Sequence, residues 1–172
     1  WSSDVCSSDL GAWRAFHRGD FKAAFDAGEK LGPVGASVAV KAIGIHAPYL
    51  VDDEAEQLKR YEQASKIAEA AIKALPDEAN SHYRHAFALG RYSQCLSITQ
   101  ALAKGIAGKV KTSLDATLEL APKHAEAHTA MGVYHAEIIE APARVPEKPQ
   151  RGCQQRQKGG RSEDRHDDSN RA

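Results

Sequence analysis

Apolar and polar residues alternate with helical spacing through most of the chain. Between residues 11 and 141, alanines and leucines recur every three or four positions, and the alternation typical of half-buried strands is absent. In the segment 18–33, Phe21 and Phe25 fall on one helical face, and Pro33 follows the last position that fits the pattern. The pattern predicts an all-α domain over residues 11–141.

A sequence repeat lies within this helical segment. With an offset of 46 residues, the string LPDEANSHYRHAFALG, which contains Pro76, aligns with APKHAEAHTAMGVYHA, which contains Pro122. Each proline is expected to end one helix, because proline has no N–H group and disfavours a helical conformation in the residue before it. The repeat therefore predicts stacked helical hairpins that form a short α-solenoid.

The repeated strings resemble the tetratricopeptide repeat, a helical hairpin of about 34 residues with bulky, small and proline positions at set spacing. The resemblance assigns a role in repeat packing to Ala64, Ala68, Ala71, Pro76, His82, His85, Ala86, Leu89, Leu114, Pro122, His128, Met131, Gly132 and His135. The spacing between the two prolines exceeds the usual period by about a dozen residues. The surplus falls in residues 92–113, which are expected to extend a helix or to form a short extra one.

The strings HYRHAFALGRYSQ and AKGIAGKVKTSLDATLELAPKHAEAHTAMGVYHAEI resemble the regulator of microtubule dynamics family and its bacterial relatives. The resemblance covers residues 11–141 and implies a tetratricopeptide-like fold with an insertion between two helices. In animal members the association is with microtubules, and bacterial members are often exported. The family supplies no catalytic motif, so the resemblance implies a non-catalytic protein without a cofactor.

A helical repeat array of this kind presents a concave face, which typically takes an extended peptide or a partner helix. We therefore predict a scaffold for protein–protein interaction, with an unknown protein or peptide partner. The candidate partner-binding residues are the polar ones on the first helices of the hairpins: Asn80, Tyr83, Arg84, Arg91, Glu126, Thr129 and Tyr134.

Two other functions compete with this prediction. The histidines could form a metal-binding or sensing module, since His124, His128 and His135 fall on one helical face, but no HExxH motif accompanies them. The acidic run at residues 52–56 could supply an acid–base pair of an enzyme. At the start of a predicted helix, however, these carboxylates more simply cap free N–H groups, and we assign no catalytic residue.

The overall charge narrows the range of partners. The chain has 23 basic and 23 acidic residues, so it has no general electrostatic attraction to nucleic acid or to an anionic membrane. No stretch is apolar for long enough to span a membrane. The three cysteines, Cys6, Cys95 and Cys153, lie far apart and form neither a zinc motif nor a CxxC redox motif. The oligomeric state remains open.

Both ends of the chain differ from the helical middle. Residues 1–10, WSSDVCSSDL, resemble a translated sequencing adaptor, so we expect the native N-terminus to be missing and weakly favour export to the periplasm over a cytoplasmic location. Residues 142–172 contain no Leu, Ile, Met, Phe, Tyr or Trp and carry eight basic and five acidic residues. This composition is typical of a disordered tail, and a frameshift explains it equally well. A nucleic-acid-binding tail is less favoured, because no aromatic residue is present to stack on a base.

Overall fold

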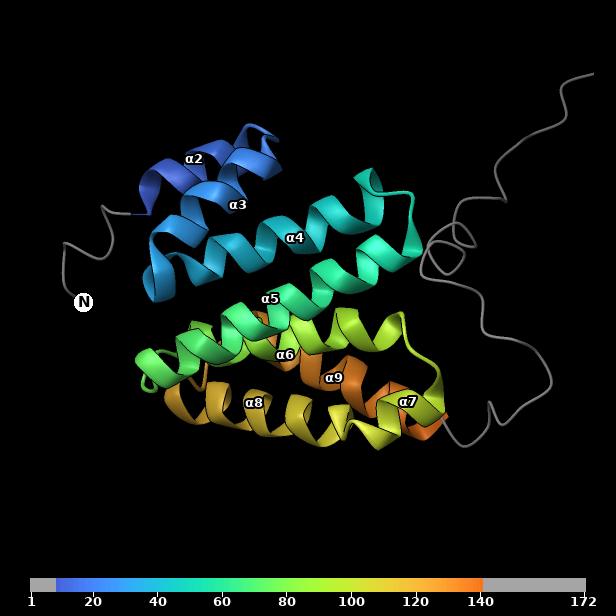
Figure 1. The fold of residues 1–172 in the computed structure, drawn as a ribbon. Helices are drawn as coiled ribbons and strands as arrows, with labels where there is room; N and C mark the ends of the chain where they lie inside the picture. The colour runs from blue at the N-terminus through green and yellow to red at the C-terminus, as the bar shows by residue number, and fades with distance from the viewer. Residues whose placement is uncertain (1–8, 141–172) are drawn as a thin grey trace, which may run out of the picture.

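The computed structural model describes residues 9–140, and its regular elements in that range are all helical (Figure 1). In chain order they are α2 (Leu10–His17), α3 (Phe21–Lys30), the 3-10 helix η1 (Gly32–Gly35), α4 (Ala36–Leu50), α5 (Glu54–Ala74), α6 (Ala79–Gln94), α7 (Ile98–Ala103), α8 (Ile106–Leu120) and α9 (Ala125–Glu140). The predictions of an artefactual leader before residue 9 and of a disordered or frameshifted tail at 142–172 fall outside the described residues. No helix in the described range is both long and apolar enough to cross a membrane.

The helices form a series of antiparallel hairpins. α2 packs on α3, α4 on α5, and α6 on α8, while α9 lies against α8 at the end of the series (Figure 1). Each hairpin also contacts the next one through α3–α4, α5–α6 and α8–α9. This succession of neighbour contacts confirms the predicted all-α helical hairpin array, and the segment 18–33 supplies a second helix, α3, as its pattern indicated.

The two aligned prolines lie in turns of the same conformation. α5 ends at Ala74 and α8 ends at Leu120, two residues before Pro76 and Pro122 respectively. The intervening residues are alike, because Leu75 has φ −133° and ψ 66° and Ala121 has φ −139° and ψ 83°. The prediction that each proline separates two helices is therefore confirmed.

The array begins slightly earlier than the sequence indicated. Leu10 is the first residue of α2, although the predicted leader extended to residue 10. Asp9 contributes as well, since its carboxylate accepts a hydrogen bond of 2.9 Å from the indole N–H of Trp13. Residues 9 and 10 thus belong to the first hairpin.

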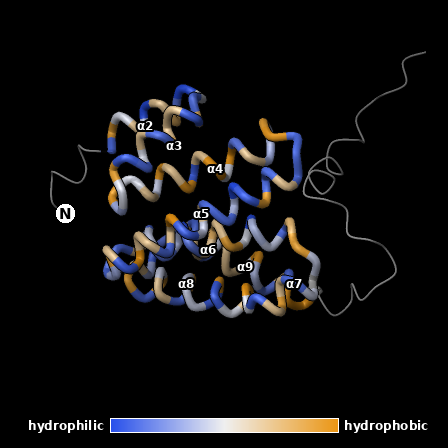
Figure 2. The backbone as a smooth tube through the Cα atoms, viewed as in Figure 1, coloured by the Kyte–Doolittle hydropathy of each residue, from blue (hydrophilic) through white to orange (hydrophobic). Residues whose placement is uncertain are grey.

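Helix α4 lies at the centre of the array and is the most apolar of the helices (Figure 2). One side of α4 packs with α2 and α3, where Val38 and Ala42 are buried, and the other side packs with α5 and α6 around Val40 and Ile43. A further cluster joins α6, α8 and α9 around Leu114. A helix that is apolar nearly all round must be covered on several sides, and α4 meets this requirement by sitting between two layers.

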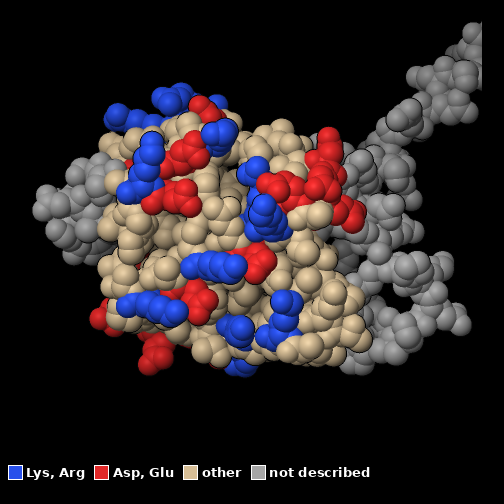
Figure 3. Space-filling model, viewed as in Figure 1, with Lys and Arg blue, Asp and Glu red and all other residues tan. Residues whose placement is uncertain are grey.

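Exposed helical faces carry charges of both signs (Figure 3). Many of them pair four residues apart, for example Arg60 with Glu56 at 3.0 Å and Lys111 with Asp115 at 2.6 Å. The acidic run at the start of α5 has a structural role, because the Asp53 carboxylate accepts hydrogen bonds from the backbone N–H groups of Ala55 and Glu56. This confirms the capping role expected for that run.

The surplus residues between α6 and α8 form a short extra helix, which is one of the two arrangements expected from the sequence. α7 begins with a capping box in which Ser97 and Gln100 exchange side-chain and backbone hydrogen bonds. Gly105 then separates α7 from α8 with a φ of 62°, a left-handed conformation that glycine adopts without steric cost. The extra helix lies in the connection between α6 and α8, beside the end of α9 (Figure 1).

Candidate functional site

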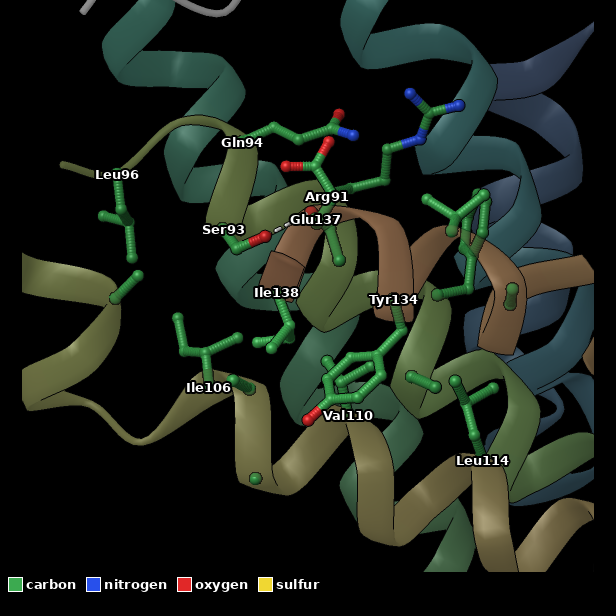
Figure 4. Close-up of a pocket in the computed structure, with 18 of the residues that line it drawn as sticks. Arg91, Ser93, Gln94, Leu96, Ile106, Val110, Leu114, Tyr134, Glu137 and Ile138 are labelled. Atoms are coloured by element: carbon green, nitrogen blue, oxygen red, sulfur yellow. Dashed lines mark hydrogen bonds between the residues drawn. The ribbon is translucent and has the colours of Figure 1, made fainter. Parts of the chain in front are cut away.

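A groove of about 1050 Å³ lies between α6, α8 and α9 (Figure 4). Most of the side chains that line the groove are apolar, and they come from α6, α7, α8 and α9. The large apolar side chains are Phe87 from α6, Leu96, Leu102 from α7, Ile106, Val110 and Leu114 from α8, and Val133 and Ile138 from α9. The groove is therefore shaped by the insertion as well as by the repeats, because α7 and the first turn of α8 form one end of it.

Polar side chains lie at the rim of the groove. Arg91 and Gln94 come from α6 and Glu137 from α9, and Figure 4 shows all three at one edge, above the apolar floor. The Arg91 guanidinium lies over the Phe87 ring, 5.6 Å from its centroid, so the charge covers apolar surface while it remains accessible. An apolar floor with a polar rim is the usual composition of a surface that binds a protein segment.

Five of the seven candidate partner-binding residues line this groove. They are Tyr83, Arg91, Glu126, Thr129 and Tyr134. Tyr83 is buried at the inner end of the groove. Because burial raises the pKa of its phenol, the side chain stays neutral at physiological pH and its ring contributes apolar surface. Tyr134 projects from α9 toward Val110 (Figure 4). The polar positions of the first helices thus converge on one site, although much of its surface is apolar.

The remaining two candidates do not line the groove. Arg84 is only 6% exposed, and its Nε donates a hydrogen bond of 3.0 Å to the Ser37 hydroxyl on α4. Its Nη2 lies 3.9 Å from a carboxylate oxygen of Glu126 on α9. Burial lowers the pKa of this guanidinium, and the neighbouring Glu126 charge opposes that effect. The prediction of a partner contact at Arg84 is therefore corrected: the side chain joins α4, α6 and α9.

Asn80 also has a structural contact. Its side-chain oxygen lies 3.2 Å from Nε2 of His124, which begins the turn into α9. His124 Nδ1 accepts a hydrogen bond from the backbone N–H of Ala127, and the ring packs against Tyr83 at a centroid distance of 4.9 Å. Asn80 and His124 thus hold the start of α9 against the start of α6, and so fix one end of the groove.

The histidines of the two repeats have matching roles. His82 Nε2 lies 2.7 Å from the carbonyl oxygen of Pro76, and His128 Nε2 lies 2.8 Å from that of Pro122. His85 Nδ1 lies 2.8 Å from the hydroxyl of Ser113 on α8, and burial, as the largest effect, lowers the pKa of this imidazole. In residues 9–140 no group of three or more His, Cys, Asp or Glu residues is arranged to hold a metal ion.

The predicted packing residues divide between the two repeats. Ala64, Ala68, Ala71, Ala86, Leu89 and Leu114 are buried, and His82, His85 and Met131 are half-buried. The two prolines lie exposed in their turns. His128, Gly132 and His135 are also exposed, which corrects their assignment to packing. The reason is that, within the part of the chain the structure describes, α6 and α8 pack on the other side of α9 and no helix covers this side.

Several lining residues were missed from the sequence because only polar residues were considered as partner contacts. Val133 and Ile138 are 57% and 44% exposed, so they are apolar surface rather than core. The available signal was that α9 carries apolar residues outside its repeat-packing positions. Ile106 and Leu102 gave no comparable signal, since their place in the groove depends on how the insertion folds.

Comparison with known proteins gives one family match. The family described as regulator of microtubule dynamics protein 1-3 matches residues 40–144, which is more than half of the chain and includes α5, α6, α8 and α9. No curated protein and no solved structure matches the sequence.

Proposed function

The chain belongs to the family of regulator of microtubule dynamics proteins 1-3, and from this premise we propose that it is a non-catalytic tetratricopeptide-like module that binds a helix of a protein partner in the groove between α6, α8 and α9. The family match supports a helical protein-interaction domain. The groove is the single observation that carries the choice of surface, because five residues selected from the repeat pattern line it.

The shape and chemistry of the groove support a helical ligand. A helix with its side chains is about 10 Å across, and it binds by inserting an apolar stripe into an apolar groove. Val110, Val133 and Ile138 would contact that stripe, while Arg91 and Glu137 at the rim would meet polar residues beside it. Binding of the partner would bury apolar side chains of α9 that are now exposed to water, and this burial is favourable.

The lining also supports a non-catalytic role. The residues around the groove include no Cys, His, Lys or Asp. Two carboxylates are present, and one of them, Glu126, lies 3.9 Å from the buried guanidinium of Arg84. The hydroxyl of Ser93 donates a hydrogen bond of 2.7 Å to the carbonyl oxygen of Gly90, so it is engaged by the backbone. These features fit recognition better than bond making.

The proposal can be tested with a displayed library of helical peptides selected on the full chain. We expect enriched peptides to carry apolar residues at i, i+3 or i+4, and i+7, and their affinity to fall at least about tenfold in Val133→Glu. Leu120→Glu is the matched control, because Leu120 is exposed near the end of α8 and does not line the groove. Selected peptides that bind both variants as well as the parent chain would refute the choice of groove.

The family description makes polymerised tubulin the first macromolecular partner to test. Co-sedimentation with microtubules that Val133→Glu abolishes and Leu120→Glu preserves would identify tubulin as the occupant of the groove. Co-sedimentation that is equal in both variants would place tubulin on another surface, and the peptide selection would then decide the role of the groove.

A further inference from the structure

Three of the α6 residues that line the groove are small and share one face of the helix. They are Ala86, Gly90 and Ser93, which follow one another at spacings of four and three positions. Apart from α6 itself, no atom lies within 4 Å of a Cβ atom built at Gly90, so the groove is open above this position. The Ser93 hydroxyl donates its hydrogen bond to the Gly90 carbonyl oxygen at 2.7 Å. We call this part of the groove the Gly90 recess.

The other side chains around the Gly90 recess are apolar. Figure 4 shows Ile106 from the first turn of α8 and Ile138 from the last turn of α9 around the same part of the groove as Ser93. Ile138 is 44% exposed, so apolar surface remains to be covered there. An aromatic or large aliphatic side chain of a ligand suits the recess, because its burial is favourable and leaves no polar group without a hydrogen bond.

The rim of the groove adds a requirement of charge. The charged residues among those that line the groove are Arg91, Glu126 and Glu137. Glu126 lies 3.9 Å from a guanidinium nitrogen of the buried Arg84, which offsets its charge. Within residues 9–140, Arg91 takes part in no ion pair. A carboxylate of a ligand would therefore complement the charge of Arg91.

Arg91 is also held in position for such a contact. Its guanidinium lies 5.6 Å from the centroid of the Phe87 ring, and Phe87 packs closely against Gly44 of α4. A side chain that is already held in place loses less conformational entropy when it forms an ion pair. Arg91 thus suits a carboxylate better than a freely moving surface cation does.

From these two features we propose that the helix bound in the groove carries an aromatic or large aliphatic anchor that fills the Gly90 recess and a Glu or Asp that pairs with Arg91. The inference rests on the proposed function and specifies the chemistry of the partner. Side chains of adjacent residues on a helix point about 100° apart, so Gly90 and Arg91 contact different positions of the ligand. The acidic residue belongs at the border of the apolar stripe, three or four positions from the anchor.

Filling the recess tests the anchor. Gly90→Leu should fold with a melting temperature at least equal to that of the parent chain, because leucine favours a helix more than glycine does. Helical peptides selected on the parent chain should bind this variant at least about tenfold more weakly. Gly11→Leu is the matched control, since Gly11 is an exposed helical glycine on α2 that is equally free of neighbours. We expect it to bind the peptides as the parent chain does.

A charge exchange tests the acidic residue. Arg91→Glu should weaken binding of the selected peptides by roughly fivefold, and replacing their acidic residue with lysine should restore binding to this variant. Arg14→Glu is the control, because Arg14 is an exposed arginine on α2 outside the groove. Selected peptides that lack an acidic residue near the anchor would overturn this part of the proposal, and so would a lysine peptide that binds Arg91→Glu no better than the original one.

The outcomes distinguish this inference from the groove itself. Peptides that lose affinity for Val133→Glu but bind Gly90→Leu as well as the parent chain would leave the groove as the binding site and overturn the anchor. Peptides that bind Val133→Glu unchanged would refute the groove, and the inference with it. Failure to select any helical peptide would have the same consequence.

Discussion

Replacing Gly28 with alanine should destabilise the array, although glycine-to-alanine substitutions within helices usually stabilise. Gly28 lies inside α3, where it contacts the start of α4. A Cβ atom there would lie 2.8 Å from the carbonyl oxygen of Gly35 and 3.0 Å from the backbone nitrogen of Ala39. These atoms belong to the backbone, so the two helices would have to move apart.

The magnitude follows from two opposing effects. Alanine gains about 0.5–1 kcal/mol over glycine in a helix interior, because it loses less conformational entropy on folding. Overpacking a tight contact costs about 1–3 kcal/mol. Gly90→Ala in α6 is the matched control, since no atom lies within 4 Å of a side chain built there and only the gain applies. The two variants should therefore differ by about 1–3 kcal/mol, with Gly90→Ala the more stable.

Thermal and urea unfolding followed by circular dichroism at 222 nm measure the difference. For a domain of this size it corresponds to roughly 3–10 °C in melting temperature. Gly28→Ala should melt below the parent chain or level with it, and Gly90→Ala should melt above it. Equal stabilisation by both substitutions would refute the close approach of α3 and α4 on which the reasoning depends.

Three further predictions concern buried and hydrogen-bonded side chains. Arg84→Ala should lower the free energy of unfolding by about 1–3 kcal/mol, because it leaves the Ser37 hydroxyl without its hydrogen bond, whereas Arg91→Ala should change it by less than about 0.5 kcal/mol. Urea titration measures both variants, and equal effects would contradict the burial of Arg84. The free energy of unfolding should fall as the pH drops below 6.5, because burial lowers the folded-state pKa values of His46 and His85 from that value and the unfolded chain then binds more protons. His85→Gln should make the free energy of unfolding differ less between urea titrations at pH 7.5 and pH 5.5. An unchanged difference would exclude His85 as a contributor. His82→Ala and His128→Ala should each lower the free energy of unfolding by about 0.5–1.5 kcal/mol and speed amide hydrogen exchange in the turn that the ring contacts. Unchanged exchange in both variants would show that these hydrogen bonds do not hold the turns.

The helical array was predictable because its signals are local. Helical periodicity and the two prolines depend on residues close together in the chain, and they located both α5–α6 and α8–α9 turns correctly. Arg84 illustrates what local patterns miss. It occupies a helical position typical of exposed polar residues, yet its side chain reaches Ser37, which is 47 residues away in the sequence. Such a contact depends on how the hairpins stack.

The groove was beyond the sequence for a similar reason. It combines Phe87, Ile106 and Val133, which come from three helices, and the insertion that shapes one end of it has no repeat counterpart. His128, Gly132 and His135 were assigned to packing by analogy with α6, but in the described part of the chain their side of α9 is exposed.

The histidine contacts in the two proline turns define which ring nitrogen acts as the donor at each joint. A carbonyl oxygen can only accept a hydrogen bond, so the proton of the neutral ring lies on Nε2 in both His82 and His128. Nδ1 is then the acceptor nitrogen of each ring. The joints between successive hairpins are therefore held by hydrogen bonds that the neutral imidazole already donates.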